Sequence, residues 1–140
     1  MRFFMYGTLR HDVPNNALAR LGLQNALQPV GPATLRGVLW HVRDVAEQME
    51  YPALDPHLKD GLVQGYLYDV SAADLPILDG WEDYTPHNEA ASLYIRREVM
   101  LESPEQMAWV YVVNPQKPLA QQPGKKILGR IESGDWLDYA

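Results

Sequence analysis

Two short segments of the chain contain the residue types that could carry out catalysis. The first, Tyr6–Leu9, reads Tyr-Gly-Thr-Leu and follows an apolar run. A buried strand that ends in such a turn can aim several backbone N–H groups into a cavity, where they bind a carboxylate or an oxyanion. The segment is also consistent with a simple turn that needs glycine to reach a positive φ.

The second segment, Leu78–Tyr84, places carboxylates between aromatic residues. Acidic side chains just past the C-terminus of a helix oppose the helix dipole, and such a broken local rule is expected at functional sites. Glu82 stands between Trp81 and Tyr84. Partial burial there would raise its pKa towards neutrality, as a general base requires. The alternative is a solvated acidic loop.

Several other chemistries lack their residues. The chain has no cysteine, which excludes disulfides, thiolate metal sites and thiol nucleophiles. The histidines lack the spacing of a metal site on one element, and neither a phosphate-binding glycine loop nor a GxSxG elbow occurs. A net charge of −6 gives no electrostatic footprint for nucleic acid. Without a run of about 18 apolar residues, we expect no membrane partner and a cytoplasmic location.

Short elements must position these two segments. The 140 residues predict a single domain over 1–140, and 11 prolines and 10 glycines favour short strands over a helical bundle. Composition and periodicity predict strands over 2–6, 33–42, 63–70, 93–101 and 107–113, the last one central in its sheet. Helices are predicted over 15–23 and from a Ser71 cap to near Gly80. Residues 45–62 are interpreted as a loop.

Taken together and in this order, the motifs resemble those of the γ-glutamylcyclotransferase-like family over almost the whole chain. The family's patterns are Y-G-T-L with a following arginine, P-[AG]-L, V-x-G-x-x-Y-x-V, L-D-x-x-E, Y-x-R, an aromatic Y-V strand and S-G-D-W. They match Tyr6–Arg10, Pro52–Leu54, Val63–Val70, Leu78–Glu82, Tyr94–Arg96, Trp109–Val112 and Ser133–Trp136. The chain departs from the pattern at Asp83, where the family usually has glycine, and in a longer Thr85–Ser92 segment.

The resemblance implies a fold and an activity. The fold is α+β, a small mixed, mostly antiparallel β-barrel with a few flanking short helices. The activity is the cyclisation of a γ-glutamyl amine or amino acid, which releases 5-oxoproline and a free amine by acyltransferase or lyase chemistry, with no metal and no cofactor. The implied general acid/base is Glu82. The implied substrate-binding residues are Tyr6, Gly7, Thr8, Leu9, Tyr94, Arg96 and Tyr111.

Two further functions remain open beside a γ-glutamylamine cyclotransferase, or a close relative, that acts on a small-molecule γ-glutamyl substrate. One is a non-catalytic module that binds a small ligand on the same scaffold, and the other is an enzyme that splits another acyl amide. The position of Glu82 discriminates between catalysis and binding alone, because the enzyme interpretation requires it in a cavity that faces the Gly7–Leu9 turn.

Individual residues also keep two interpretations. Arg96 is consistent with a substrate carboxylate ligand or an exposed strand residue, and Tyr111 with a cavity or a core residue. The Thr85–Ser92 segment is consistent with a lid, a specificity loop or a tolerated insertion. The sequence does not specify the leaving group or the oligomeric state.

Overall fold

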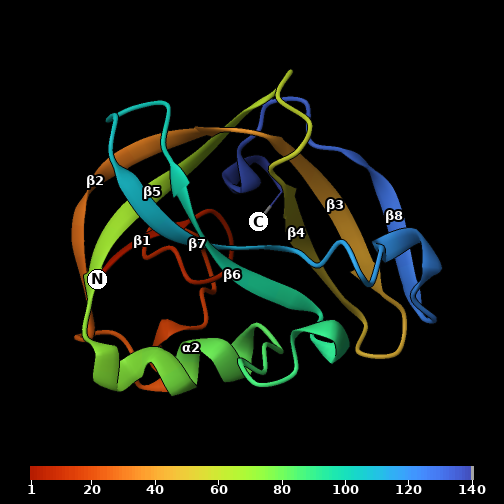
Figure 1. Ribbon diagram of the computed structural model, residues 1–140, viewed down its shortest axis with the longest axis horizontal. Coiled ribbons are helices and arrows are strands. Elements are labelled where there is room, and N and C mark those ends of the chain that lie inside the picture. Colours follow the sequence, from red (N-terminus) through yellow and green to blue (C-terminus); the bar gives the residue numbers. More distant parts are fainter. Residues whose placement is uncertain (140) are drawn as a thin grey trace.

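Two β-sheets make up most of the fold. The computed structural model describes residues 1–139. In Figure 1 the larger sheet lies on the left and the smaller on the right, and helix α2 runs along their lower end. The strands are β1 (Arg2–Met5), β2 (Leu27–Arg36), β3 (Val38–Asp44), β4 (Met49–Asp55), β5 (Leu62–Val70), β6 (Tyr94–Met100), β7 (Met107–Val113) and β8 (Lys125–Arg130).

Within residues 1–139 the helical segments are short, and all but the last of them lie between strands. The two α-helices are α1 (Leu18–Leu21) and α2 (Leu75–Trp81). The single-turn 3₁₀ segments are η1 (Ala72–Asp74), η2 (Glu89–Ala91), η3 (Leu119–Gln121) and η4 (Trp136–Asp138). Among the described residues, no helix has the length and apolar character that crossing a membrane requires.

The central strand of the larger sheet is β1. The strand order is β2-β5-β1-β7-β6, and β1 pairs antiparallel with β5 and parallel with β7. Phe3 and Phe4 are fully buried and Met5 is nearly so, because packed layers cover both faces of this strand. The sequence-based predictions of a buried first strand and of an interior strand at 107–113 are therefore confirmed.

The smaller sheet has the order β4-β3-β8, and both of its strand pairs are antiparallel. Its inward-facing Leu39 and Leu54 pack in one cluster with Phe4 and Leu67 of the larger sheet. The α+β class and the mostly antiparallel pairing are as predicted. The expected barrel is corrected, however, because over residues 1–139 the strands form two separate sheets that do not close on each other.

Sequence reasoning misplaced some of the strands. Segment 45–62 contains β4, which its prolines concealed because Pro52 lies within the strand, opposite His41 of β3. The single strand predicted over 33–42 is in fact the end of β2 and most of β3, which are separated at Gly37 and belong to different sheets. Strand β8 lies in a tail for which no strand was predicted.

Helix α2 forms where the sequence predicts a helix, although Pro76 lies within it. Proline there occupies the first turn of α2, where its missing N–H has no helical acceptor to lose. The preceding Ser71 caps η1, because its Oγ accepts from the N–H of Ala73 at 3.3 Å. The chain therefore enters α2 directly from β5, and the far end of α2 carries Glu82.

Gly65 of β5 marks the closest approach between the two central strands of the larger sheet. A Cβ atom at this position would lie 2.5 Å from the Phe4 ring and 2.6 Å from the Met5 carbonyl oxygen. We expect Gly65→Ala to destabilise the protein by about 1–3 kcal/mol through overpacking, measured by urea denaturation.

Gly80 of α2 provides the matched control for this substitution. A Cβ atom there meets nothing within 4 Å, and alanine is the better helix former. Gly80→Ala should therefore stabilise the protein by up to about 1 kcal/mol. Equal effects of the two substitutions would contradict the assigned close approach at Gly65.

Candidate active site

A cavity of about 290 Å³ opens where α2, the end of β1 and the hairpin of β3 and β4 meet. This volume is close to the lower end of the roughly 300–1,000 Å³ range of small-molecule sites. Most of the wall is apolar or aromatic. The residues that line the cavity are Phe4, Met5, Tyr6, Gly7, Thr8, Leu9, Asp44, Glu47, Met49, Tyr51, Pro52, Trp81, Glu82, Asp83, Leu93, Tyr94, Tyr111 and Lys125.

Most of the site residues predicted from the sequence meet at this cavity. The turn Tyr6–Leu9, Glu82, Tyr94 and Tyr111 all line it, although they come from four different parts of the chain. Arg96 does not line the cavity. Glu82 therefore has the position that the enzyme interpretation requires, because its side chain shares one space with the Gly7–Leu9 turn.

Glu82 is the C-cap residue of α2, and its backbone N–H donates to the Leu78 carbonyl oxygen at 3.1 Å. No donor among residues 1–139 forms a hydrogen bond with its carboxylate. Burial raises the pKa of Glu82 from 4.5 to about 8, because the aromatic wall replaces the water that would solvate the charge. Asp83, the neighbouring carboxylate, is exposed and is not the cause of this increase.

Four tyrosines line the same cavity as Glu82. The pKa values of these four tyrosines are raised, mainly by burial: Tyr6, Tyr51, Tyr94 and Tyr111. The negative charge of Glu82 adds to the increase in each of them. The Tyr6 hydroxyl donates to the Tyr111 carbonyl oxygen at 2.6 Å, and the Tyr94 hydroxyl donates to the Pro52 carbonyl oxygen at 3.3 Å. These bonds fix the ring positions, so the walls around Glu82 are rigid.

The Tyr6–Leu9 turn brings backbone donors to the same space. Within the described chain, the N–H groups of Gly7, Thr8 and Leu9 have no hydrogen-bond acceptor, whereas the next one, Arg10, donates to the Gly7 carbonyl oxygen. Trp81 Nε1 donates to Thr8 Oγ1 at 3.3 Å and ties the turn to α2. The arrangement is therefore suited to holding a negatively charged group.

Position 7 requires glycine because a larger side chain has no room there, and not because the backbone is left-handed. Its φ is not among the positive values of the chain. A Cβ atom at Gly7 would lie 2.9 Å from Cγ of Pro52, so a side chain would push the turn away from β4. Asp83, by contrast, does adopt the left-handed region, with φ of 53°. It occupies the position at which the family pattern has glycine. Glycine adopts this conformation at lower cost than aspartate.

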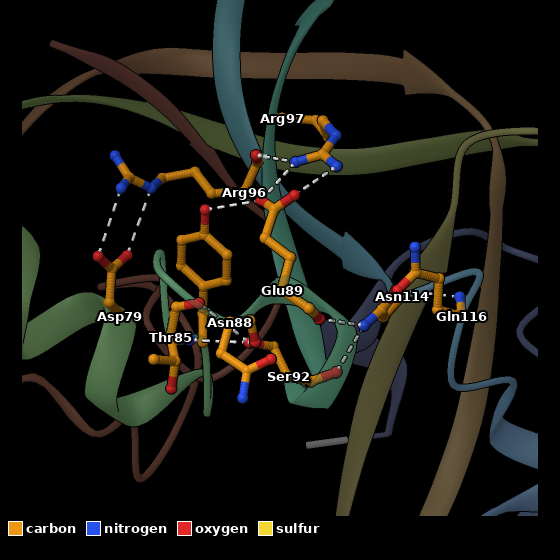
Figure 2. Close-up of polar contacts among 10 residues, drawn as sticks. Asp79, Thr85, Asn88, Glu89, Ser92, Arg96, Arg97, Asn114 and Gln116 are labelled. Carbon is orange, nitrogen blue, oxygen red and sulfur yellow. Dashed lines mark hydrogen bonds and ion pairs between the residues drawn. The ribbon is translucent and has the colours of Figure 1, made fainter.

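Asp79 anchors α2 to the larger sheet. Its Oδ1 accepts from the Tyr111 hydroxyl at 2.6 Å, and its carboxylate forms an ion pair with Arg96, whose Nη2 lies 3.4 Å from Oδ2. The Arg96 guanidinium also lies over the rings of Tyr84 and Trp109. Figure 2 shows the pair of Asp79 and Arg96. Arg96 thus holds the helix that carries Glu82 and does not reach the cavity.

The Thr85–Ser92 segment is tied to the sheet instead of covering the cavity. Asn114 Nδ2 donates to the carbonyl oxygens of Glu89 and Ser92, at 2.7 and 2.8 Å, and Arg97 forms a two-pronged ion pair with Glu89 (Figure 2). Ser92 Oγ accepts from the Thr85 N–H at 2.8 Å. None of these residues lines the cavity. The contacts match a structural insertion better than a lid.

Sequence reasoning missed one side of the site. Asp44, Tyr51 and Lys125 line the cavity from β3, β4 and β8. No local motif marks them, and two of these strands were not predicted. The register of β3 with β8, in which Asp44 faces Lys125, brings these side chains together. Across residues 1–139, no three His, Asp or Glu side chains are grouped as metal ligands.

Comparisons with known proteins show the family and the fold of the chain. The family model described as "Gamma-glutamyl cyclotransferase, AIG2-like" matches residues 3–138. Protein YtfP from Escherichia coli is 29% identical over 99% of this chain and 98% of its own, with a TM-score of 0.60. No curated protein sequence matches the chain.

Two more distant structures share the fold. A protein from Pyrococcus horikoshii is 19% identical over 99% of this chain and 91% of its own, with a TM-score of 0.61. An AIG2-like protein from Mus musculus is 23% identical over 80% of this chain and 76% of its own, with a TM-score of 0.56.

The half-buried carboxylate of Glu82 predicts a pH-dependent loss of stability. Between pH of about 4.5 and about 8, the folded state holds the Glu82 proton more tightly than the unfolded state does, so stability falls as pH rises through this window. Glu82→Gln removes this loss. We expect the variant to be more stable than the natural protein above about pH 8, and the difference to shrink towards about pH 4.5.

Urea denaturation of the natural protein and of Glu82→Gln at a series of pH values measures the difference between their free energies of unfolding. The titrations of all other groups cancel in this difference. A difference that does not change with pH would contradict the assigned burial of Glu82.

Proposed function

Because the chain belongs to the AIG2-like gamma-glutamyl cyclotransferase family, we propose that it cyclises γ-glutamyl compounds to 5-oxoproline and releases an amine. The observation that carries this proposal is the position of Glu82, which shares a cavity with the unbonded N–H groups of Gly7–Leu9. The reaction needs one group that moves protons and one set of donors for negative charge. This cavity offers both.

The substrate supplies its own nucleophile in this reaction. The α-amine of a γ-glutamyl group can attack the γ-carbonyl carbon of the same molecule and close a five-membered ring. Intramolecular attack has a high effective molarity once the chain is held in a folded conformation. A rigid cavity of about 290 Å³ favours such a conformation, and no nucleophilic side chain is required.

Glu82 is the proposed general acid and base. Its carboxylate takes a proton from the α-ammonium group, and the freed amine then forms the new C–N bond. As the tetrahedral intermediate collapses, protonated Glu82 delivers its proton to the leaving nitrogen and the original amide C–N bond breaks. The ring nitrogen then gives up its second proton to the departing amine, which leaves as an ammonium ion. The products are 5-oxoproline and the free amine, and Glu82 ends as it began. A pKa of about 8 suits both halves of this cycle.

The backbone donors of the Tyr6–Leu9 turn are proposed to stabilise negative charge. The substrate presents an α-carboxylate, and its γ-carbonyl oxygen becomes an oxyanion in the intermediate. Donors that are already oriented require no rearrangement when that charge develops. Trp81 supports this geometry through its hydrogen bond to Thr8, because it links the turn directly to the helix that carries Glu82.

Glu82→Gln tests the proposed role. The variant keeps the shape of the side chain and cannot accept a proton, so we expect 5-oxoproline release to fall at least about 100-fold. Binding of 5-oxoproline, measured by calorimetry, should change little. Glu47→Gln is the matched control, because Glu47 is another glutamate in the cavity wall and should retain its activity.

Two outcomes would contradict the assignment. A Glu82→Gln variant with more than about a tenth of the natural activity excludes Glu82 as the general base. Ligand binding by the natural protein without any 5-oxoproline release would instead favour the non-catalytic binding module.

The pH dependence of kcat/KM gives a second test. If the free enzyme needs Glu82 ionised, log(kcat/KM) should fall with a slope of about one below the pKa of about 8. Above this pH range the α-ammonium group of the substrate loses the proton that Glu82 must accept. The value of kcat/KM should therefore fall again, and its pH profile should be bell-shaped. A profile that is flat from about pH 6 to about pH 8 would assign the proton transfer to another group.

A further inference from the structure

A second polar cluster lies in the cavity wall contributed by the smaller sheet. Asp44 ends β3 and Lys125 begins β8, strands that run side by side in Figure 1. Lys125 Nζ donates to Asp44 Oδ2, and the two side chains are only 16% and 11% exposed. The ammonium also lies 5.4 Å from the centre of the Tyr51 ring. We call Asp44, Tyr51 and Lys125 the lysine cluster.

The lysine cluster has donors that the protein does not use. The Tyr51 hydroxyl is buried and has no hydrogen-bond partner within residues 1–139. An ammonium group has three N–H bonds, and one of those of Lys125 Nζ is directed at Asp44. Leaving a buried donor unsatisfied is costly, so the Tyr51 hydroxyl and the Lys125 ammonium are suited to an acceptor on a ligand.

Asp44 acts as the support of this cluster. Its Oδ1 already accepts from the Glu47 N–H at 3.0 Å while its Oδ2 holds Lys125. Its carboxylate is therefore occupied on both oxygens. The cluster as a whole presents donors to the cavity and not acceptors, and among the described lining residues Lys125 is the one basic side chain.

Tyr51 connects the lysine cluster to Glu82. Burial raises the pKa of Tyr51, the Lys125 ammonium acts against this increase, and the Glu82 carboxylate adds to it. The tyrosine is thus within electrostatic reach of both groups. The cavity wall thus contains the unbonded carboxylate of Glu82 and the basic side chain of Lys125.

We infer that the lysine cluster binds a carboxylate on the leaving half of the substrate, and so selects γ-glutamyl conjugates of amino acids over conjugates of uncharged amines. The inference rests on the proposed function and extends it to the leaving group. Glu82 must lie at the scissile amide to protonate the leaving nitrogen. The part of the substrate beyond that nitrogen then extends along the cavity, and a carboxylate there meets Lys125 and Tyr51.

A pair of matched substrates tests the inference. γ-Glutamylalanine and γ-glutamylethylamine differ only by the carboxylate on the leaving amine. We expect the natural protein to prefer the alanine conjugate by about 10-fold or more in kcat/KM, since hydrogen bonds to charged groups have effects of this size. Lys125→Met should remove this preference by slowing the alanine conjugate alone.

Two further variants keep the test decisive. Tyr51→Phe removes a single hydroxyl that no protein group bonds, so it should fold normally and lower kcat/KM several-fold for the alanine conjugate alone. Lys126→Met removes the neighbouring, exposed lysine and should change neither substrate.

The contrary outcomes are distinct from one another. If Lys125→Met and Tyr51→Phe slow both substrates equally, or if the natural protein turns over both equally well, the inference is overturned and the proposed function stands. If the natural protein releases 5-oxoproline from neither conjugate, the proposed function fails and the inference fails with it.

Discussion

The attachment of α2 to β7 and β6 through Asp79 is the contact on which the geometry of the site depends. Asp79 lies one helical turn before Glu82 and is held by the Tyr111 hydroxyl and the Arg96 guanidinium. A nearly buried carboxylate is costly unless it is paired and hydrogen-bonded, and this one has both partners. Glu82 has neither. The helix and its C-cap thus carry two carboxylates in contrasting situations, one that fixes the position of the helix and one that no protein group binds.

This division of duties explains why the site combines rigidity with an unfavourable charge. Three of the tyrosines in the cavity wall donate to backbone carbonyl oxygens or to Asp79, namely Tyr6, Tyr94 and Tyr111. Their hydroxyls are therefore not free to solvate the Glu82 carboxylate. The fold accepts a less stable ionised state in return for a proton acceptor near neutral pH, a trade typical of active sites. The hydrophobic contacts of both sheets supply the stability that makes this possible.

The sequence predicted the central strands, α2 and most of one side of the cavity, because each depends on a local pattern. Tyr6–Leu9 and Glu82 stand next to elements with clear periodicity, so their positions followed from the chain itself. The role of Arg96 was harder to predict, because its spacing in the sequence does not indicate whether its side chain reaches the ligand or supports Asp79. The lysine cluster could not be predicted, because Asp44 and Lys125 meet only through the pairing of β3 with β8. Prolines concealed β4, and with it Tyr51.

The central place of β1 has a consequence for synthesis on the ribosome. Arg2–Met5 leaves the exit tunnel before both of its partners, which are β5, at Leu62–Val70, and β7, at Met107–Val113. Until both have emerged, an apolar segment with two open edges stays unpaired, and such edges readily associate with other chains. Such wide separation of paired segments also slows folding. The strand that leads into the Tyr6–Leu9 turn is therefore the segment of the larger sheet that waits longest for its second partner during synthesis.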